Sequence, residues 1–196
     1  FPTQVDEEIF NKIYERAHPL GDDVQIFQGI PTSLDDLYIL QKKENGTYRV
    51  PLSGREYHFE DDFIKPFVRG KDVHRYENLN TQLFIFFPYF VEDGGFRPAN
   101  LDYIRDKCPN TYRYICDHES NFKDRENGKA GKQSHWFGYL RLQNMTKYDL
   151  SRISSMEICT NHPNVTMNKA FYHGTKVYSW VIKNESSHIS YDYLLG

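Results

Sequence analysis

Cations and aromatic side chains alternate along residues 63–76, FIKPFVRGKDVHRY, which is the part of the chain with the clearest chemistry. Lys65, Arg69, Lys71 and Arg75 place a positive charge every few residues among apolar side chains. This mixture suits contacts to phosphate groups together with packing against sugar or base. The stretch therefore indicates binding of a polyanion rather than catalysis.

Motifs for catalysis are missing from the sequence. It contains no GxGxxG, GxxxxGK[ST], HExxH or GxSxG pattern. Carboxylates cluster at Glu60, Asp61 and Asp62, which suggests a metal site, but a solvated turn that starts a helix or strand is the favoured interpretation. Residues 87–90, FPYF, resemble half of the adenine-methyltransferase motif without its first polar residue, so we interpret them as a strand end.

Charge is unevenly distributed in a chain whose net charge is −3. Residues 1–62 carry thirteen acids and six bases, whereas residues 121–152 carry seven bases and three acids. The total charge argues against a nucleic-acid-binding protein, but a basic face is what an electrostatic footprint requires. The Gly- and Lys-rich stretch 123–132 is predicted to be an exposed cationic loop that could enter a groove of DNA.

Length and composition place the chain among folded, single-domain proteins. Its 196 residues are 39% hydrophobic and 16% aromatic, which excludes a disordered chain. Three cysteines without CxxC spacing argue against a disulfide framework or a zinc site and favour the cytoplasm. Sequons at Asn45, Asn144, Asn164 and Asn184 would be glycan sites in a secreted protein, but chance occurrence is favoured. No apolar run approaches the roughly 20 residues that cross a bilayer.

Hydrophobic patterning predicts an α+β fold, with a twisted mixed or antiparallel β-sheet and a few packed helices. The predicted helices cover residues 5–17 and 100–108, the second with Asn100 as its cap and Pro109 as its end, and a further helix continues through residue 125. We expect a loop at 127–134, helix or turn at 145–153, and a connection at 163–174. The predicted strands are 24–30, 37–43, 47–54, 81–90, 135–142, 156–161 and 175–184.

Four segments occur in an order that is informative. They are Pro19-Leu20 with residues 29–33 (GIPTS), residues 65–76 (KPFVRGKDVHRY), Phe87-Pro88-Tyr89, and Trp136-Phe137 with Arg141. In these segments the chain resembles the TaqI-like C-terminal specificity domain, the target-recognition domain of adenine-specific DNA methyltransferases and type IIG restriction-modification enzymes. The resemblance covers nearly the whole chain, and residues 65–76 are its most specific part. Two departures are Ser33, where family members usually have Gly, and residues 156–158, which lack the usual Lys-Ile.

The resemblance implies sequence-specific binding of duplex DNA, with no catalysis by this chain itself. The chain would be one specificity domain over residues 1–196, with residues 1–20 as a helix leading into it. Because it begins at Phe1 and ends on Leu194-Leu195-Gly196, we expect a fragment of a longer cytoplasmic chain. A methyltransferase domain of that parent chain would be its partner and would bind S-adenosylmethionine, with Mg²⁺ if a nuclease is also present. We expect no membrane association.

The expected DNA contacts combine the resemblance with the charge pattern. Asp72 is expected to hold Arg69 or Arg75, either as a structural salt bridge or as support for phosphate contact, and Gly70 to permit a tight bend. Base-specific contacts are expected from residues 121–135, from the Thr32-Ser33 loop and from residues 168–173, whereas Trp136 is favoured as a core residue. The predicted DNA-binding residues are Thr32, Ser33, Lys65, Arg69, Lys71, Arg75, Lys123, Arg125, Lys129, Lys132, Trp136 and Arg141.

Two alternatives stay open at this stage. The chain could be a protein-interaction domain that docks onto a separate methyltransferase subunit, which the net negative charge favours slightly. It could also be a secreted carbohydrate-binding module, as the aromatic residues and the sequons suggest.

Overall fold

The computed structural model describes residues 4–92, 94–159, 162–183 and 189–196. The helices are α1 (Gln4–Arg16), α2 (Leu20–Asp23), α3 (Asp35–Tyr38), α4 (Leu101–Lys107), α5 (Pro109–Asp117), α6 (Glu119–Lys123), α7 (Arg125–Gly128) and α8 (Tyr191–Leu195), with short 3₁₀ helices η1 (Asp61–Phe63), η2 (Gly70–Asp72) and η3 (Ala130–Lys132). The strands are β1 (Val24–Gln28), β2 (Ile39–Lys42), β3 (Tyr48–Arg49), β4 (Glu56–Tyr57), β5 (Ile64–Val68), β6 (Leu83–Phe86), β7 (Tyr89–Glu92), β8 (Gly95–Pro98), β9 (Arg152–Met156), β10 (Val165–Asn168), β11 (Tyr172–His173) and β12 (Val177–Ile182).

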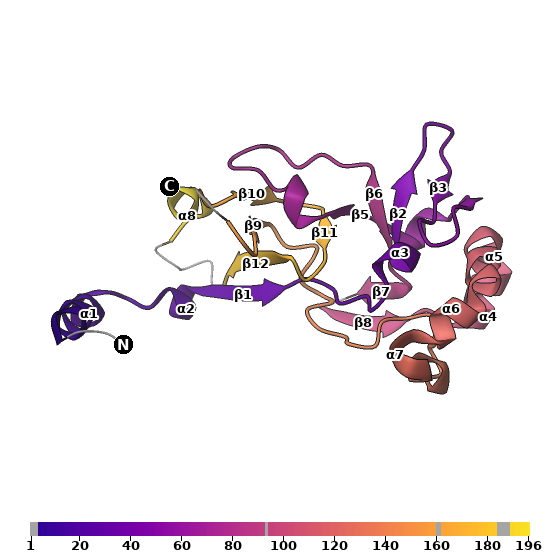
Figure 1. The fold of residues 1–196 in the computed structure, drawn as a ribbon, viewed down its shortest axis with the longest axis horizontal. Helices are drawn as coiled ribbons and strands as arrows, with labels where there is room; N and C mark the ends of the chain where they lie inside the picture. Colours follow the sequence, from indigo (N-terminus) through magenta and orange to yellow (C-terminus); the bar gives the residue numbers. More distant parts are fainter. Residues whose placement is uncertain (1–3, 93, 160–161, 184–188) are drawn as a thin grey trace.

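These strands form three sheets, so the predicted α+β class is confirmed. One sheet has the order β1-β12-β9-β10, a larger one has the order β11-β5-β6-β2-β3-β4, and β7 pairs with β8. Figure 1 shows α4, α5, α6 and α7 gathered at one end of the molecule and α1 at the opposite end, beyond the four-stranded sheet. All strand pairs in these sheets are antiparallel except β11 with β5.

The two larger sheets meet where the chain leaves β1. Ile30 forms an isolated parallel bridge with Gly174, directly after β11, and its N–H donates to the carbonyl of His173 at 2.9 Å. A Cβ atom on Gly29 would lie 2.1 Å from the His173 carbonyl oxygen, so this crossing of two backbones requires glycine. The contact fixes the loop after β1 against the β11–β12 connection.

Aromatic side chains fill the core between the six-stranded sheet and the helices. Tyr38, Phe86, Tyr114 and Phe122 are fully buried, and Phe86 meets Tyr114 edge to face with 5.2 Å between ring centroids. Aromatic pairs of this kind contribute about 0.5–1.5 kcal/mol beyond the area they bury. The Tyr38 hydroxyl also donates to the carbonyl of Phe137 at 3.0 Å, which brings the segment after η3 against the same core.

Several predicted elements are confirmed. The helix expected at 5–17 is α1, and the strands expected at 24–30 and 175–184 contain β1 and β12. Asn100 caps α4 as predicted, because its Oδ1 accepts a hydrogen bond of 2.7 Å from the Asp102 N–H. Pro109, however, is also the first residue of α5, a position where a missing N–H costs nothing.

Other predictions were wrong in whole or in part. Residues 135–142 form turns instead of a strand, because their backbone groups bond to side chains. The carbonyl of Trp136 accepts from Arg125 Nη2 at 2.7 Å, and the N–H of Tyr139 donates to the Tyr89 hydroxyl at 2.6 Å. The stretch 163–174, expected to be a connection, contains β10 and β11. The exposed loop expected at 127–134 is confirmed in part: most of its residues are exposed and Asn127 has non-helical backbone angles, although the segment contains η3 and the buried Ala130.

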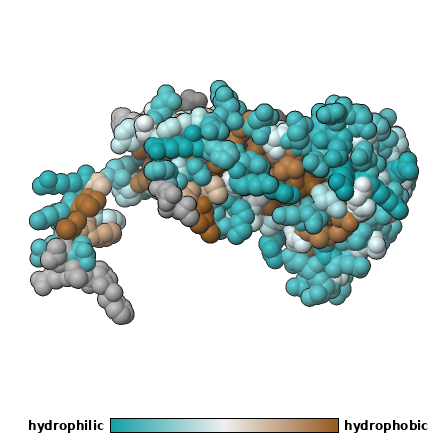
Figure 2. All heavy atoms as spheres, turned by 45° about the horizontal axis from the view of Figure 1, so that its top comes forward, coloured by the Kyte–Doolittle hydropathy of each residue, from teal (hydrophilic) through white to brown (hydrophobic). Residues whose placement is uncertain are grey.

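Helix α1 has an apolar face, and that face is exposed. Ile9, Phe10, Ile13 and Tyr14 are between 52% and 68% exposed, and Phe10 stacks on Tyr14 with 6.0 Å between ring centroids. Figure 2 shows these apolar side chains as a stripe on the projecting helix at the left. Among the described residues, no helix combines the length and the apolar character that crossing a bilayer demands.

Candidate functional site

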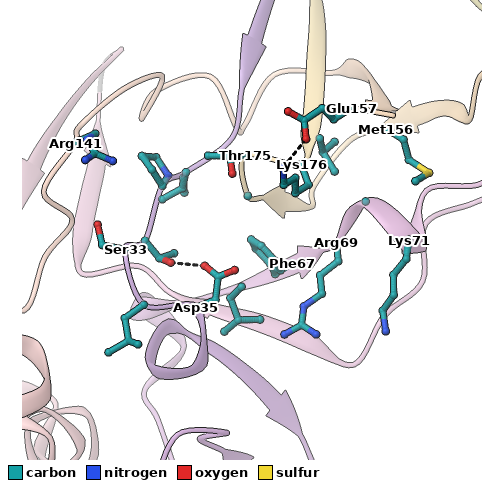
Figure 3. A pocket seen from close by; sticks show the side chains of 18 of the residues that line it. Ser33, Asp35, Phe67, Arg69, Lys71, Arg141, Met156, Glu157, Thr175 and Lys176 are labelled. Atoms are coloured by element: carbon teal, nitrogen blue, oxygen red, sulfur yellow. Dashed lines mark hydrogen bonds and ion pairs between the residues drawn. The ribbon is translucent and has the colours of Figure 1, made fainter. Parts of the chain in front are cut away.

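A cleft of about 720 Å³ opens where the two larger sheets meet. Figure 3 shows side chains around it from segments that are far apart in sequence. Its walls come from the loop after β1, the turn from β5 into η2, Arg141, the end of β9, and the connection from β11 to β12. Of the predicted DNA-binding residues, the cleft brings together Thr32, Ser33, Arg69, Lys71 and Arg141.

Arg69 and Lys71 lie on the turn that follows β5. The carboxylate of Asp72 accepts a hydrogen bond of 2.7 Å from the backbone N–H of Arg69, which closes the single turn of η2. The expected salt bridge from Asp72 to Arg69 or Arg75 is therefore wrong, since Asp72 holds the backbone instead. In Figure 3 the side chains of Arg69 and Lys71 extend in the same direction from this turn.

Glycine is favoured at position 70 because a side chain there would be crowded by the neighbouring backbone. A Cβ atom at this position would lie 3.1 Å from the carbonyl oxygen of Lys176, at the edge of the contact between η2 and the β11–β12 connection. The bend expected here is the turn of η2, and it requires no left-handed backbone angle, because Gly70 is absent from the positive-φ residues of the described chain. The close approach lets Lys176 join Arg69 and Lys71 at the cleft.

The loop after β1 reaches the cleft through Ser33. Thr32 is buried and its hydroxyl donates to Asp35 in the first turn of α3, so it shapes the loop rather than facing outward. Ser33 has a φ of 63°, a left-handed conformation that favours glycine. The Ser33 hydroxyl donates to Oε1 of Glu126 at 2.9 Å.

Arg125 is a structural residue, which corrects the expectation that it contacts DNA. It is 4% exposed, and its guanidinium donates to four carbonyl oxygens. Those carbonyls belong to Phe122, Thr32, Trp136 and Gly138, so one side chain joins α6, the loop after β1 and the turn after η3. Arg125 thereby positions Ser33 and the segment that carries Arg141.

The remaining predicted cations lie outside the cleft. Lys65 is half-buried on β5, and Arg75 folds over the ring of Tyr76 with its guanidinium carbon 4.8 Å from the ring centroid. Lys123 pairs with Glu119 on α6 and lies over the ring of Trp136. Lys129 and Lys132 are exposed on the segment that follows Glu126. Trp136 itself is half-buried and packs against Phe122 and Phe137.

Residues 168–173, expected to supply base contacts, are divided between core and surface, with Lys169 and Ala170 exposed. Asn168, Tyr172 and His173 are at most 3% exposed. Arg152, also fully buried, donates from Nε to the Ser179 hydroxyl at 3.1 Å, and that hydroxyl lies 2.5 Å from Nε2 of His173. Burial lowers the pKa of His173 to about 3, with a smaller contribution from the Arg152 charge, so the imidazole is neutral and accepts from Ser179.

Sequence reasoning missed Lys176 and Glu157. Nζ of Lys176 lies 2.8 Å from a carboxylate oxygen of Glu157, and both residues line the cleft. No local pattern marks them, because the parallel pairing of β11 with β5 is what carries this connection to the site. With them, the cleft lining has four cations and two carboxylates, and is positive in a chain whose net charge is −3.

The Glu60 carboxylate, considered as a metal ligand, serves a helix end. Its Oε1 accepts from the Asn110 N–H at 3.0 Å and its Oε2 from the Thr111 N–H at 2.9 Å, both in the first turn of α5. Burial raises its pKa, but the hydrogen bonds from Thr111 and Asn110 outweigh that effect and lower it. Within the described ranges, no three His, Cys, Asp or Glu side chains gather as a metal site.

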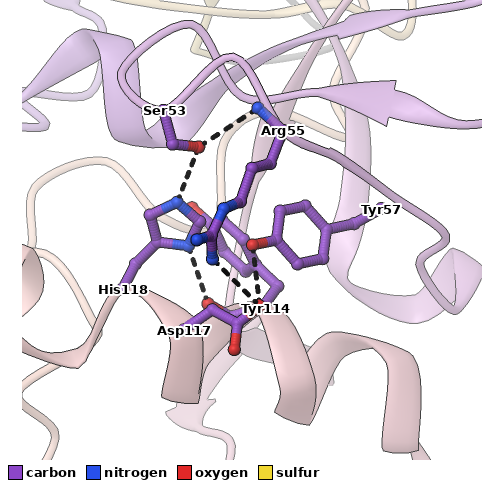
Figure 4. Close-up of polar contacts among 6 residues, drawn as sticks. All are labelled: Ser53, Arg55, Tyr57, Tyr114, Asp117 and His118. Carbon is purple, nitrogen blue, oxygen red and sulfur yellow. Dashed lines mark hydrogen bonds and ion pairs between the residues drawn. The ribbon is translucent and has the colours of Figure 1, made fainter.

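Ser53 and His118 form a second polar cluster (Figure 4). Nδ1 of His118 lies 3.0 Å from the Tyr114 carbonyl and therefore donates to it, while Nε2 lies 2.9 Å from the Ser53 hydroxyl. The nearby Asp117 accepts from the Tyr57 hydroxyl at 2.9 Å and pairs with Arg55. Because the carboxylate serves Tyr57 and Arg55 rather than the imidazole, the cluster ties the turn after β3 to α5 and is not a hydrolase triad.

No protein-family model matches this chain, and no curated protein matches its sequence. The site must therefore be interpreted from its own geometry.

Proposed function

We propose that this chain binds duplex DNA as the specificity domain of an adenine-specific DNA methyltransferase or restriction-modification enzyme. The observation that carries the proposal is that Arg69 and Lys71, predicted from one segment, and Arg141, predicted from another, line one positive cleft. Phosphate contacts require such a local concentration of cations, and a negative total charge does not oppose it.

The position of the acidic helix α1 supports the same proposal. Helix α1, with acids in its first turn, projects from the end of the molecule opposite α4–α7 (Figure 1). The cleft opens between the two larger sheets, and α1 contributes nothing to its lining. Repulsion between α1 and a polyanion in the cleft is therefore weakened by distance and by salt screening.

A salt titration of DNA binding tests the proposal. Binding of the 196-residue chain to a fluorescent mixed-sequence duplex is measured by anisotropy at several salt concentrations. The double variant Arg69→Ala/Lys71→Ala should weaken binding and make the log–log slope less negative by about 0.9 for each phosphate that the variant no longer neutralises. A wild-type slope near zero would contradict DNA binding.

Lys107→Ala/Arg113→Ala provides the matched control. Both residues are exposed on α4 and α5, and neither lines the cleft. This variant changes the net charge by the same amount as the cleft variant, so it should leave the slope unchanged. Equal effects of the two double variants would point to diffuse attraction and against the cleft as the DNA site.

The exposed apolar face of α1 favours a second candidate function, docking onto another protein. An amphipathic helix with Ile9, Phe10, Ile13 and Tyr14 exposed suits a hydrophobic groove on a partner. In our proposal that partner is a methyltransferase domain, and S-adenosylmethionine, with Mg²⁺ for any nuclease, would be bound there rather than in the cleft.

Replacing Ile13 on this face tests the docking. Ile13→Asp should abolish co-purification with a methyltransferase domain while leaving DNA binding by the isolated chain intact. Unchanged co-purification would contradict this docking.

A further inference from the structure

The four cations that line the cleft belong to two classes. Nη2 of Arg141 lies 2.9 Å from Oε1 of Glu126, and Nζ of Lys176 lies 2.8 Å from Oε2 of Glu157. Arg69 and Lys71, in contrast, form no ion pair with any residue that the structure describes. A cation beside a carboxylate attracts a polyanion less than one without such a partner, so the two classes should act differently on DNA.

Glu126 is fixed in place on both sides. Its Oε1 accepts from the Ser33 hydroxyl as well as from Arg141, each at 2.9 Å. Its backbone has a φ of 50°, directly after Arg125, whose guanidinium is locked on four carbonyls. The bond from Ser33 therefore holds the Glu126 carboxylate at the loop after β1 independently of Arg141.

Arg141 is held by this carboxylate while most of its side chain faces solvent. Its side chain is 62% exposed, compared with 27% for Glu126. One nitrogen of the planar guanidinium is engaged, so the other N–H groups remain available in a direction that Glu126 sets. A planar guanidinium held in one direction can donate two parallel hydrogen bonds to the O6 and N7 acceptors of guanine in the major groove.

We infer that Arg141 reads a base edge with Glu126 as its positioning residue, whereas Arg69 and Lys71 contact phosphates. This inference rests on the proposed function and assigns separate roles within the same cleft. Arg141, with its charge offset by Glu126, contributes sequence discrimination and little non-specific affinity. Arg69 and Lys71 contribute non-specific affinity and its salt dependence.

Salt dependence on a non-specific duplex separates the two classes. We expect the charge-neutral double variant Glu126→Gln/Arg141→Ala to leave the log–log slope unchanged and Arg69→Ala to make it less negative by about 0.9. Glu126→Gln frees the charge of Arg141 and should make the slope more negative by about the same amount.

Base preference is measured by selecting bound sequences from a random duplex library. Arg141→Lys keeps the charge but loses the planar fork, so it should lose a guanine preference by about tenfold or more at one position. Glu126→Gln should weaken the preference at that same position. The control Glu157→Gln frees Lys176 in the same cleft and should steepen the salt slope without changing any base preference.

The outcomes distinguish this inference from the proposed function. If the wild-type chain binds no duplex at low salt, the proposed function fails and the inference fails with it. If the wild type binds but selects no sequence, the proposed specificity function fails together with the inference. If the wild type selects a sequence and Arg69→Ala flattens the slope, either of two results overturns the inference alone. The first is that Arg141→Lys keeps every base preference, and the second is that Glu126→Gln/Arg141→Ala flattens the slope as Arg69→Ala does. Arg141→Lys leaves the Ser33–Glu126 bond in place, so base preference can still be measured with this variant if Glu126→Gln fails to fold.

Discussion

Both oxygens of the Glu60 carboxylate are used at the start of α5, and Thr111 gives one of them two hydrogen bonds. The Thr111 N–H donates at 2.9 Å and its hydroxyl at 2.6 Å, across 51 positions of sequence. The first N–H groups of a helix have no partner within the helix, and Cys108, which precedes α5, supplies no side-chain cap. Glu60 replaces that cap from another part of the chain.

Replacing Glu60 with Gln should lower the free energy of unfolding by about 1–2 kcal/mol at pH 7. Hydrogen bonds from Thr111 and Asn110 hold the folded-state pKa of Glu60 below its ordinary value of 4.5. The stabilisation by the carboxylate is therefore complete above pH 4.5 and is lost as the pH falls through the folded-state pKa. Urea unfolding at pH 7 and pH 3 checks this, and a difference between wild type and variant that stays constant with pH would contradict it.

His173 should make the fold sensitive to acid. Its folded-state pKa of about 3 lies below the ordinary value of 6.5, so the unfolded chain binds a proton more readily between these values. The free energy of unfolding should therefore fall as the pH decreases below about 6.5, with no contribution from His173 above it. His173→Gln should show a shallower dependence between pH 6.5 and pH 5 in urea titrations; an unchanged dependence would assign the effect to other groups.

Trp136→Ala should destabilise the fold more than it weakens DNA binding. The indole packs against Phe122 and Phe137 at the edge of the core, with ring centroids 6.1 Å and 5.4 Å away. Because the ring is half-buried, we expect a reduction in stability of about 2 kcal/mol, less than for a fully buried tryptophan. A lower melting temperature with an unchanged salt slope of the folded variant is the expected pair of results, and a flattened slope would instead place Trp136 in the DNA footprint.

Lys129→Ala/Lys132→Ala tests how far the DNA footprint extends. Both side chains are exposed on the segment that begins at Arg125 and Glu126, next to the edge of the cleft. If DNA spans this segment, the salt slope should become less negative by about 0.9 for each phosphate that these lysines neutralise, with little change in melting temperature. An unchanged affinity would confine the footprint to the cleft.

Sequence patterns predicted elements well where local chemistry determines them. Residues 5–17 repeat apolar side chains at the spacing of a surface helix, and Asn100 stands where a helix cap is needed. Both predictions were confirmed. The strand predicted at 135–142 was wrong because apolar alternation says nothing about hydrogen-bond partners. The backbone there bonds to Tyr38 and Tyr89, which are far away in sequence, and to Arg125, which lies 13 positions before Gly138.

The candidate site could be predicted only in part for the same reason. Arg69, Lys71 and Arg141 stand out as cations near aromatic residues, and the fold brings them to one cleft. Arg125 looks identical in sequence, but its burial depends on four carbonyls, of which those of Thr32, Trp136 and Gly138 lie in other segments of the chain. The role of Glu126 depends on its contacts with Ser33 and Arg141, which no spacing in the sequence indicates.

Strand β1 has its partner near the other end of the chain, since Val24 pairs with Ile182 in the four-stranded sheet. During translation β1 is synthesised early. It can pair with β12 only after the whole six-stranded sheet has been translated. Pairing over such a separation forms slowly, because the conformational entropy of a very long loop is lost before contacts between the strands compensate for it. Nascent chains arrested before residue 177 should therefore expose β1 as an open edge, which makes this sheet the part of the protein that most needs protection from aggregation during synthesis.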